Sequence, residues 1–314
     1  PSPKMSTYDT AFKDGRWAIL FGIHDIKQTS FPPPGAITDS KWMYYFSLLD
    51  ESLHPLMEKP ILFEKFDRGE QLSGRVLSIH AMETGFVAVW AVNRDFFYQE
   101  FDMSGARLRD KRKFYSSEER AGTRDSVMAM AYRDGAIVLL LRQAPENFYT
   151  GKWGINLVRH RIKTKETQTF TNIFPNESES GCYHAKGMDL YFAGPSMFAT
   201  WIDGTEVREK PKDSSYTLAP HLQFGRCSGQ DMRCEVSTID NTPASYNTAE
   251  LRFLLRDGAL PIAISDGENT GKQDIGPDGA LTGQAQKMTA EEKAVLLPQH
   301  CAKKHFPYAI HIGK

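Results

Sequence analysis

The amino-acid sequence predicts an all-β protein, and three observations support this prediction. The 314 residues include 19 Phe, 12 Tyr and 5 Trp together with 24 Gly and 17 Pro, a composition typical of many short strands joined by turns. Short apolar segments recur along the chain, each followed by turn residues. Helix signals are confined to one capping box, Thr289-Ala290-Glu291-Glu292, which predicts a helix of about two turns that ends before Pro298.

Length and charge limit the classes of function. A chain of 314 residues can bury a full hydrophobic core. Its 38 basic and 39 acidic residues give a net charge of −1, so we expect no nucleic-acid partner. The longest apolar segments, such as Ala136–Leu141, are too short to cross a bilayer, so we expect no transmembrane segment. The first residues, Pro1-Ser2-Pro3-Lys4, resemble neither a signal peptide nor a natural start, and we expect a removed leader or a trimmed chain.

A repeated unit is clearest between Gly85 and Leu108. An apolar segment, Gly85–Trp90, is followed by a polar break and an aromatic segment, Phe96–Asp102. A turn at residues 103–106 leads into a third, polar segment that begins at Arg107. Each segment has the length of a strand, so the unit is interpreted as a small antiparallel sheet.

Other copies of this unit follow the same order. The first begins at Asp14 and resumes at Lys41 after a loop insertion at about residues 22–40, and a third begins at Asp134. Two later segments, residues 188–204 and 251–265, each have the form of a hairpin. The Gly-rich span 265–287 contains few apolar residues and is predicted to be a second long, exposed loop insertion.

Small antiparallel sheets bury their apolar faces only against one another, so we expect these units to stack. Units of about 40–50 residues with three or four strands predict a single domain over residues 1–314 that closes into a β-propeller of about five or six blades. Paired β-sandwiches are the alternative fold. The segment Gly85–Leu108 resembles the repeats of bacterial β-propeller repeat proteins, in which an apolar strand ending in Trp precedes an aromatic strand and an Asp-x-x-Gly turn. The resemblance implies the same propeller fold.

The four cysteines permit two disulfides. Cys227 and Cys234 flank a short polar stretch, so a local bridge between them could close a hairpin, and Cys182 and Cys301 would then form the second bridge. Disulfides persist in oxidising compartments, so we favour a secreted, periplasmic or cell-surface protein. The alternative is four buried thiols in a cytosolic protein.

The sequence contains no motif for a metal ion or a cofactor. Neither a C-x-x-C nor an H-x-x-x-H pair is present, so we expect no metal site and no cofactor. The nucleophile motif G-x-S-x-G and a phosphate-binding glycine loop are also absent. Motifs alone therefore identify no catalytic residue.

Carboxylates are the remaining candidates for catalysis, because propeller glycosidases place Asp and Glu on inner strands around a central funnel. Four aspartates lie at the ends of predicted strands: Asp25, Asp95, Asp189 and Asp203. The alternative, which the sequence favours, is turn chemistry, in which each aspartate bonds its own backbone.

Two groups of residues are candidates for ligand binding. Trp90 with Arg94 and Asp95, and Trp201 with Asp203, each combine an indole ring that can stack on a sugar with side chains that bind hydroxyl groups. The favoured alternative places each tryptophan in the core between sheets.

No catalytic candidate outweighs its structural alternative. The preferred functional prediction is therefore a non-catalytic binding or interaction module of an exported protein, whose ligand is a protein partner or a glycan. The alternative is a propeller-type glycoside hydrolase with carboxylates in the funnel. The basic run Arg107–Lys113 is interpreted as a solvated outer strand that discourages edge pairing.

Overall fold

The computed structural model describes residues 4–26, 40–67, 77–117, 126–143, 154–174, 185–193, 196–207, 217–228, 232–239, 250–253, 262–265, 270–276 and 278–289. The chain divides into two compact units. Unit one comprises residues 1–141 and 158–169, and unit two comprises residues 142–157 and 170–314. All regular structure in the described residues is β-strand, so the all-β prediction is confirmed. None of these residues belongs to a helix long and apolar enough to cross a membrane.

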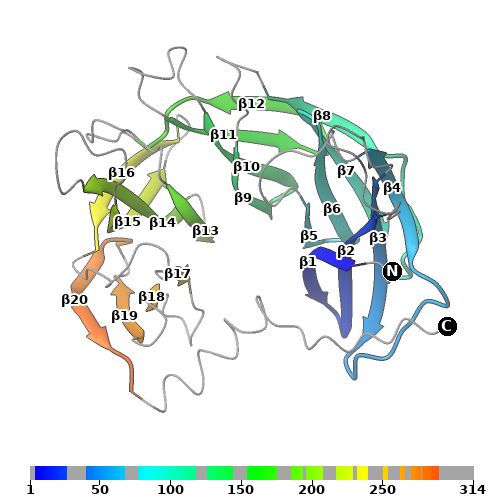
Figure 1. The fold of residues 1–314 in the computed structure, drawn as a ribbon, viewed down its shortest axis with the longest axis horizontal. Helices are drawn as coiled ribbons and strands as arrows, with labels where there is room; N and C mark the ends of the chain where they lie inside the picture. Colours follow the sequence, from blue (N-terminus) through cyan, green and yellow to red (C-terminus); the bar gives the residue numbers. More distant parts are fainter. Residues whose placement is uncertain are drawn as a thin grey trace, which may run out of the picture. The chain divides into compact units, whose positions relative to one another are not determined.

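The described strands form five four-stranded sheets, and in each sheet the strands follow chain order (Figure 1). The first sheet contains β1 (Lys4–Lys13), β2 (Arg16–Ile26), β3 (Ser40–Asp50) and β4 (Ile61–Asp67), and the second contains β5 (Leu77–Met82), β6 (Gly85–Val92), β7 (Asp95–Asp102) and β8 (Arg112–Ser116). The third contains β9 (Ser126–Arg133), β10 (Ala136–Gln143), β11 (Gly154–Arg161) and β12 (Glu166–Phe170). The fourth contains β13 (Lys186–Ala193), β14 (Ser196–Val207), β15 (Thr217–Ser228) and β16 (Arg233–Thr238), and the fifth contains β17 (Glu250–Phe253), β18 (Ile262–Ser265), β19 (Thr270–Ile275) and β20 (Leu281–Lys287).

Tight turns join first and second strands in unit one. Asp14 and Gly15 have φ angles of 46° and 77°, and Asp134 and Gly135 have φ angles of 49° and 75°. Two successive positive φ angles are characteristic of a type I′ turn, for which Asp-Gly is a preferred sequence. The Asp-Gly dipeptides that marked the repeats in the sequence are therefore the turns that bring β1 onto β2 and β9 onto β10.

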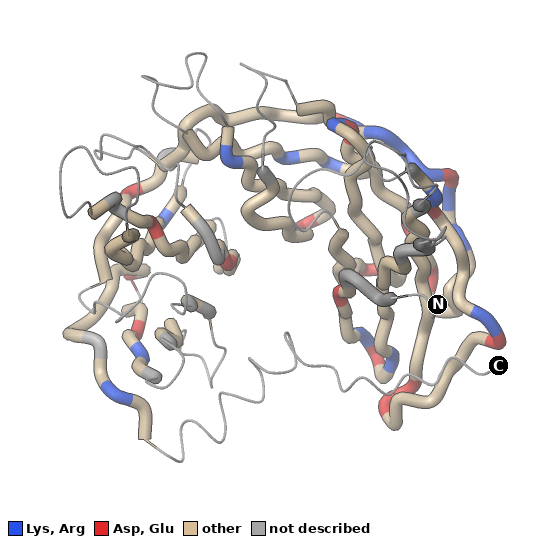
Figure 2. Tube along the Cα trace, in the orientation of Figure 1, with Lys and Arg blue, Asp and Glu red and all other residues tan. Residues whose placement is uncertain are grey.

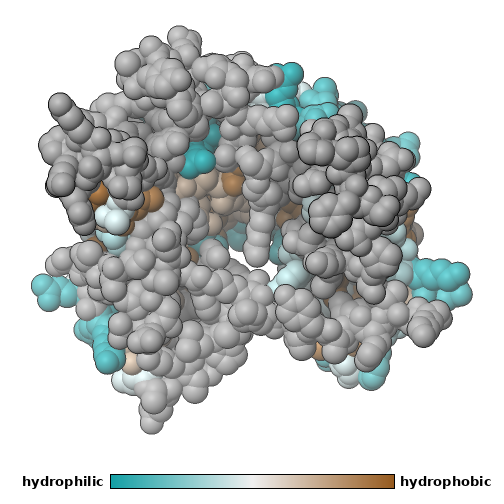
Figure 3. All heavy atoms as spheres, viewed as in Figure 1, coloured by the Kyte–Doolittle hydropathy of each residue, from teal (hydrophilic) through white to brown (hydrophobic). Residues whose placement is uncertain are grey.

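Apolar side chains pack between neighbouring sheets. Between the first and second sheets, the rings of Phe46 and Phe101 stack with centroids 4.0 Å apart, and both side chains are fully buried. A second cluster, which includes Leu139, lies between the second and third sheets. In unit two, Phe224 and Ile264 belong to a cluster between the fourth and fifth sheets. On the face drawn in Figure 3, described hydrophilic residues project at the periphery and hydrophobic residues lie deeper.

The prediction of a long loop at residues 265–287 is wrong, because strands β19 and β20 occupy most of this span. Its glycines have two different roles, in strands and in turns, and composition alone does not distinguish them. Gly271 lies in a strand and pairs with Ile264, whereas Gly279, with φ 79°, forms the turn between β19 and β20. The predicted insertion at 22–40 begins later than expected, because β2 extends to Ile26. Its residues 27–39 lie outside the described residues, as does the predicted helix from residue 290 onward.

Cys227 and Cys234 form a disulfide, as the sequence predicts. The two residues face each other across β15 and β16, and seven positions separate them in the chain. The bridge therefore closes the hairpin between these strands. Cys182 and Cys301 lie outside the described residues, so their pairing stays a prediction.

Replacing both Cys227 and Cys234 by alanine is expected to lower the free energy of unfolding by about 2–3 kcal/mol, because the bridge restricts the unfolded chain around a short loop. Urea unfolding of the wild type and the variant measures this difference. The wild type unfolded in the presence of a reductant is the control and should match the variant. Equal unfolding midpoints for the oxidised wild type and the variant would contradict the expectation.

Candidate functional site

Two aspartates occupy equivalent positions on first strands of their sheets. Asp9 on β1 pairs with Leu20 on β2, and Asp189 on β13 pairs with Thr200 on β14. Each aspartate lies four residues before the end of its strand, at Lys13 and Ala193 respectively. The same residue type therefore recurs at the same distance from the hairpin in unit one and in unit two.

The two aspartates also make the same hydrogen bond. In unit one, the backbone N–H of Ile79 on β5 donates to Oδ2 of Asp9 at 2.9 Å. In unit two, the backbone N–H of Phe253 on β17 donates to Oδ2 of Asp189 at 3.0 Å. Both acceptors are half-buried carboxylates. Each aspartate thus connects the first strand of one sheet to the first strand of the next sheet.

Sequence reasoning found one of these aspartates and missed the other. Asp189 is one of the predicted strand-end candidates, whereas Asp9 lies within a long strand, where no turn signal marks it. An alignment of the repeats on their first hairpins, Lys13 to Arg16 and Ala193 to Ser196, places the two aspartates in one column. That register is the signal that could have identified Asp9.

Ile79, whose N–H bonds Asp9, is flanked on β5 by two polar residues, Ser78 and His80. Ser78 Oγ lies 2.5 Å from Nε2 of His80. Burial lowers the pKa of His80 to about 4, because the charged imidazolium loses its hydration there. At neutral pH the imidazole is therefore uncharged, and it forms a hydrogen bond with the hydroxyl of Ser78.

The neutral state of His80 predicts a pH-dependent stability. A histidine in the unfolded chain has a pKa of about 6.5, so between this pH and about 4 the unfolded state binds more protons than the folded state. The free energy of unfolding should therefore fall as the pH decreases through this window, by about 1–3 kcal/mol from this residue. Urea unfolding at several pH values measures the effect, and His80→Gln should remove this part of it. An identical pH dependence in the wild type and the variant would refute the assignment.

The tryptophans predicted to bind a ligand are buried. Trp90 and Trp201 are 0% and 2% exposed, and each follows the first residue of its second strand, Gly85 or Ser196, by the same five positions. Neither ring can stack on a sugar without opening the core, so the core alternative replaces the ligand-binding prediction for both.

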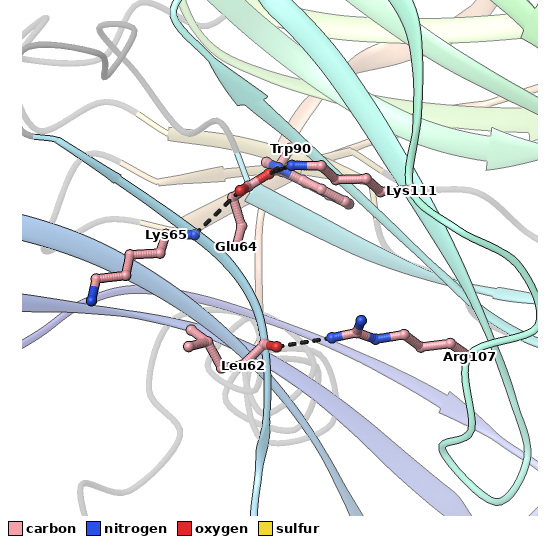
Figure 4. Close-up of polar contacts among 6 residues, drawn as sticks. All are labelled: Leu62, Glu64, Lys65, Trp90, Arg107 and Lys111. Carbon is pink, nitrogen blue, oxygen red and sulfur yellow. Dashed lines mark hydrogen bonds and ion pairs between the residues drawn. The ribbon is translucent and has the colours of Figure 1, made fainter.

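Trp90 is held by contacts from the first sheet. Its Nε1 donates to Oε2 of Glu64 at 3.0 Å, and Nζ of Lys111 lies 2.8 Å from the same oxygen (Figure 4). The ring of Phe63 meets the indole edge-on, with centroids 4.9 Å apart. A guanidinium–carbonyl bond from Arg107 to Leu62 adds a further connection between these sheets.

The polar candidates are occupied by local structure. The carbonyl of Arg94 accepts the N–H of Ser117 at 2.8 Å, and Oδ1 of Asp95 accepts the hydroxyl of Ser116 at 2.5 Å. Asp203 is buried beside Trp201, and its Oδ1 accepts the N–H of Gly204, the next residue. Only Asp203 bonds its own backbone, and it lies within β14 and not in a turn. Asp95 instead bonds a hydroxyl on the neighbouring strand β8, so the turn chemistry expected for it is not found.

The residues of each predicted group lie close together in the chain. Trp90 lies on β6, Arg94 in the turn that follows it and Asp95 at the start of β7, whereas Trp201 and Asp203 share β14. Asp25 lies on β2 opposite Lys41, but its side chain is outside the described residues. Among the described residues, no three His, Cys, Asp or Glu side chains converge as metal ligands would.

Comparison with known proteins finds similarity at the level of structure. No family model and no curated protein matches the sequence. An α-L-arabinanase from Penicillium chrysogenum, solved with arabinobiose, matches with a TM-score of 0.50 and 9% identity, over 91% of this chain and 81% of its own. A mutant GH32 β-fructofuranosidase from Bombyx mori, solved with sucrose, gives 0.46 and 11%, over 91% and 63%. A sucrose-6-phosphate hydrolase from Lactobacillus gasseri gives 0.46 and 12%, over 92% and 62%.

The match to the arabinanase shows the fold. Together with the four-stranded, up-and-down sheets it identifies them as blades, so the predicted β-propeller is confirmed over the paired β-sandwiches. The described residues contain five sheets, the lower of the two predicted blade numbers. The preferred prediction, a non-catalytic binding module, is contradicted, because the matching arabinanase is an enzyme.

Proposed function

We propose that this chain is a β-propeller glycoside hydrolase whose catalytic carboxylates lie on first strands, with Asp9 as the candidate in unit one and Asp189 as the candidate in unit two. The observation that carries the proposal is their equivalence, since each is a half-buried carboxylate at the same position of a first strand. The propeller fold, which an arabinanase shares, supports the proposal because inner strands of propeller glycosidases supply their catalytic Asp and Glu.

Hydrolysis of a glycosidic bond requires two carboxyl groups with different roles. One donates a proton to the oxygen of the leaving group, and the other, ionised, attacks the anomeric carbon or takes a proton from the attacking water. In this chain, the peptide N–H groups of Ile79 and Phe253 orient the two aspartates through their Oδ2 atoms. An oriented carboxylate loses little further freedom when substrate binds, which lowers the barrier to reaction.

The substrate class and the compartment follow from the same proposal. The proposed substrate is a glycan. The sequence predicts a glycan as a bound ligand, and the proposal makes it the substrate instead. The disulfide between Cys227 and Cys234 supports an exported protein, secreted, periplasmic or on the cell surface, because such bridges are rare in reducing compartments.

A hydrolysis screen tests the proposal. The full chain is incubated with arabinan, fructan, galactan and xylan from acid to neutral pH, and the release of reducing sugar is measured. We expect release from at least one glycan, and no release by a double variant, Asp9→Asn with Asp189→Asn. Inactivity of the wild type on the whole panel, or equal activity of the double variant, would overturn the proposal.

A further inference from the structure

Two short segments of unit one carry an excess of positive charge. Residues 107–113 contain five Lys or Arg and one Asp, and residues 161–166 contain three Lys or Arg and one Glu. Their combined net charge is +6, whereas the whole chain carries −1, so the remainder of the chain carries −7. We call these two segments the basic surface.

The two segments belong to neighbouring sheets. Each spans the connection from the third to the fourth strand, between β7 and β8 in the second sheet and between β11 and β12 in the third. The hydroxyl of Thr167 on β12 donates to the carbonyl of Phe114 on β8 at 3.2 Å, which places these two outer strands next to each other. Figure 2 shows Lys and Arg along the outer side of this region.

Six of the eight cations in the basic surface form no ion pair with a described residue. Lys111 pairs with Glu64 at 2.8 Å and Lys113 pairs with Asp95 at 3.3 Å. Arg107 donates to the carbonyl of Leu62, and Arg112 is half-buried. The other four are exposed and form no ion pair with any described residue: Arg109, Arg161, Lys163 and Lys165. These four charges face solvent without local compensation, so their field attracts anions.

Protection of a sheet edge accounts for only part of this charge. Arg112 and Lys113 lie on β8, an outer strand, where charged side chains discourage edge pairing. The cations of the third sheet, however, lie in the hairpin at residues 161–165, whereas the outer strand β12 has the sequence Glu-Thr-Gln-Thr-Phe and contains no cation. Lys165 even occupies a left-handed conformation, φ 60°, where asparagine or glycine would be less strained. The hairpin charge therefore calls for another explanation.

We propose that the basic surface binds a carboxylated polysaccharide, such as a polyuronate, outside the first-strand site. The choice of a glycan rests on the proposed function. Repeated carboxylates along the polymer match the several cations of two adjacent hairpins, and the exposed hydroxyl of Thr164 can bond its hydroxyl groups. Nucleic acid fits less well, because single strands need exposed aromatic platforms, and the described residues of these two segments include none.

Affinity electrophoresis of the full chain through polygalacturonate tests the proposal. The variant Arg109→Gln/Lys163→Gln/Lys165→Asn removes three uncompensated charges, and Asn at residue 165 suits the local backbone. We expect its dissociation constant to rise about tenfold, since each exposed charge contact contributes a fraction of a kcal/mol. Binding by the wild type should weaken as salt rises from about 10 to about 100 mM, because screening shortens the range of these charges.

A control variant with the same charge loss, Lys59→Gln/Lys65→Gln/Lys287→Gln, changes exposed lysines elsewhere and should bind as the wild type does. If both variants bind polygalacturonate equally weakly, the loss of binding follows from net charge alone, and the proposal is overturned. Tighter binding to a DNA fragment than to polygalacturonate would also overturn it. The assay measures binding without turnover, so its outcome is separate from that of the hydrolysis screen.

Discussion

Replacing Asp9 or Asp189 singly by asparagine is expected to lower kcat for glycan hydrolysis by about 10²–10⁴-fold, the range typical of a lost general acid or base. Asparagine keeps the size of the side chain and an oxygen that can accept the N–H of Ile79 or Phe253. It cannot, however, donate a carboxylic proton or carry the negative charge. Initial rates of sugar release by each purified variant, with circular dichroism to verify folding, measure the effect.

Asp14→Asn is the matched control for this prediction. Asp14 follows the same strand as Asp9, is exposed, and has φ 46°, a conformation that asparagine tolerates. Its loss removes one carboxylate without changing the turn, so hydrolysis should be unchanged. If the control and the Asp9 variant lose activity equally, or neither first-strand variant loses any, the assignment of the catalytic carboxylates fails.

A substitution to alanine separates the two roles of these aspartates. Asp9→Ala leaves the N–H of Ile79 without its acceptor, which costs about 1–3 kcal/mol of stability when the group is shielded from water. Asp9→Asn should retain most of that stability and still lose activity. Catalysis and connection between first strands would then appear as two separable functions of one residue.

The hairpins explain why the fold could be predicted and Asp9 could not. Asp14-Gly15 and Asp134-Gly135 are local signals, because two adjacent residues determine the conformation of the turn. The importance of Asp9 depends instead on Ile79, which is 70 positions away in the chain. A partner at that distance becomes visible only when the sheets are placed side by side.

The same reasoning applies to the tryptophans. In the sequence, Trp90 stands at the end of an apolar segment and next to polar residues, which fits a sugar-binding ring as well as a buried one. The contact that decides between them comes from Glu64, 26 positions earlier and on another sheet. Alternation of apolar and polar residues predicts which segments are strands, but in a sheet buried on both faces it does not predict which residues face a ligand.

Trp90→Ala is expected to lower the free energy of unfolding of unit one by about 3–5 kcal/mol, as large truncations in packed cores do. The indole is fully buried, and its loss leaves a cavity between the first and second sheets. It also removes one of the two donors to Oε2 of Glu64, so that Lys111 alone compensates this carboxylate oxygen. Urea unfolding followed by circular dichroism measures the change.

Two further variants divide this effect into its causes. Trp90→Phe fills most of the cavity but lacks the N–H group, so it should cost about 1.5–3 kcal/mol, the contribution of a hydrogen bond to a charged acceptor. Trp17→Ala removes a ring that is only half-buried and should cost less than Trp90→Ala. If Trp90 instead served a ligand, Trp90→Ala would leave the unfolding midpoint unchanged and weaken glycan binding. We expect the largest loss of stability for Trp90→Ala, a smaller loss for Trp90→Phe and a small loss for Trp17→Ala. This order is the one expected if Trp90 is a core residue between two sheets.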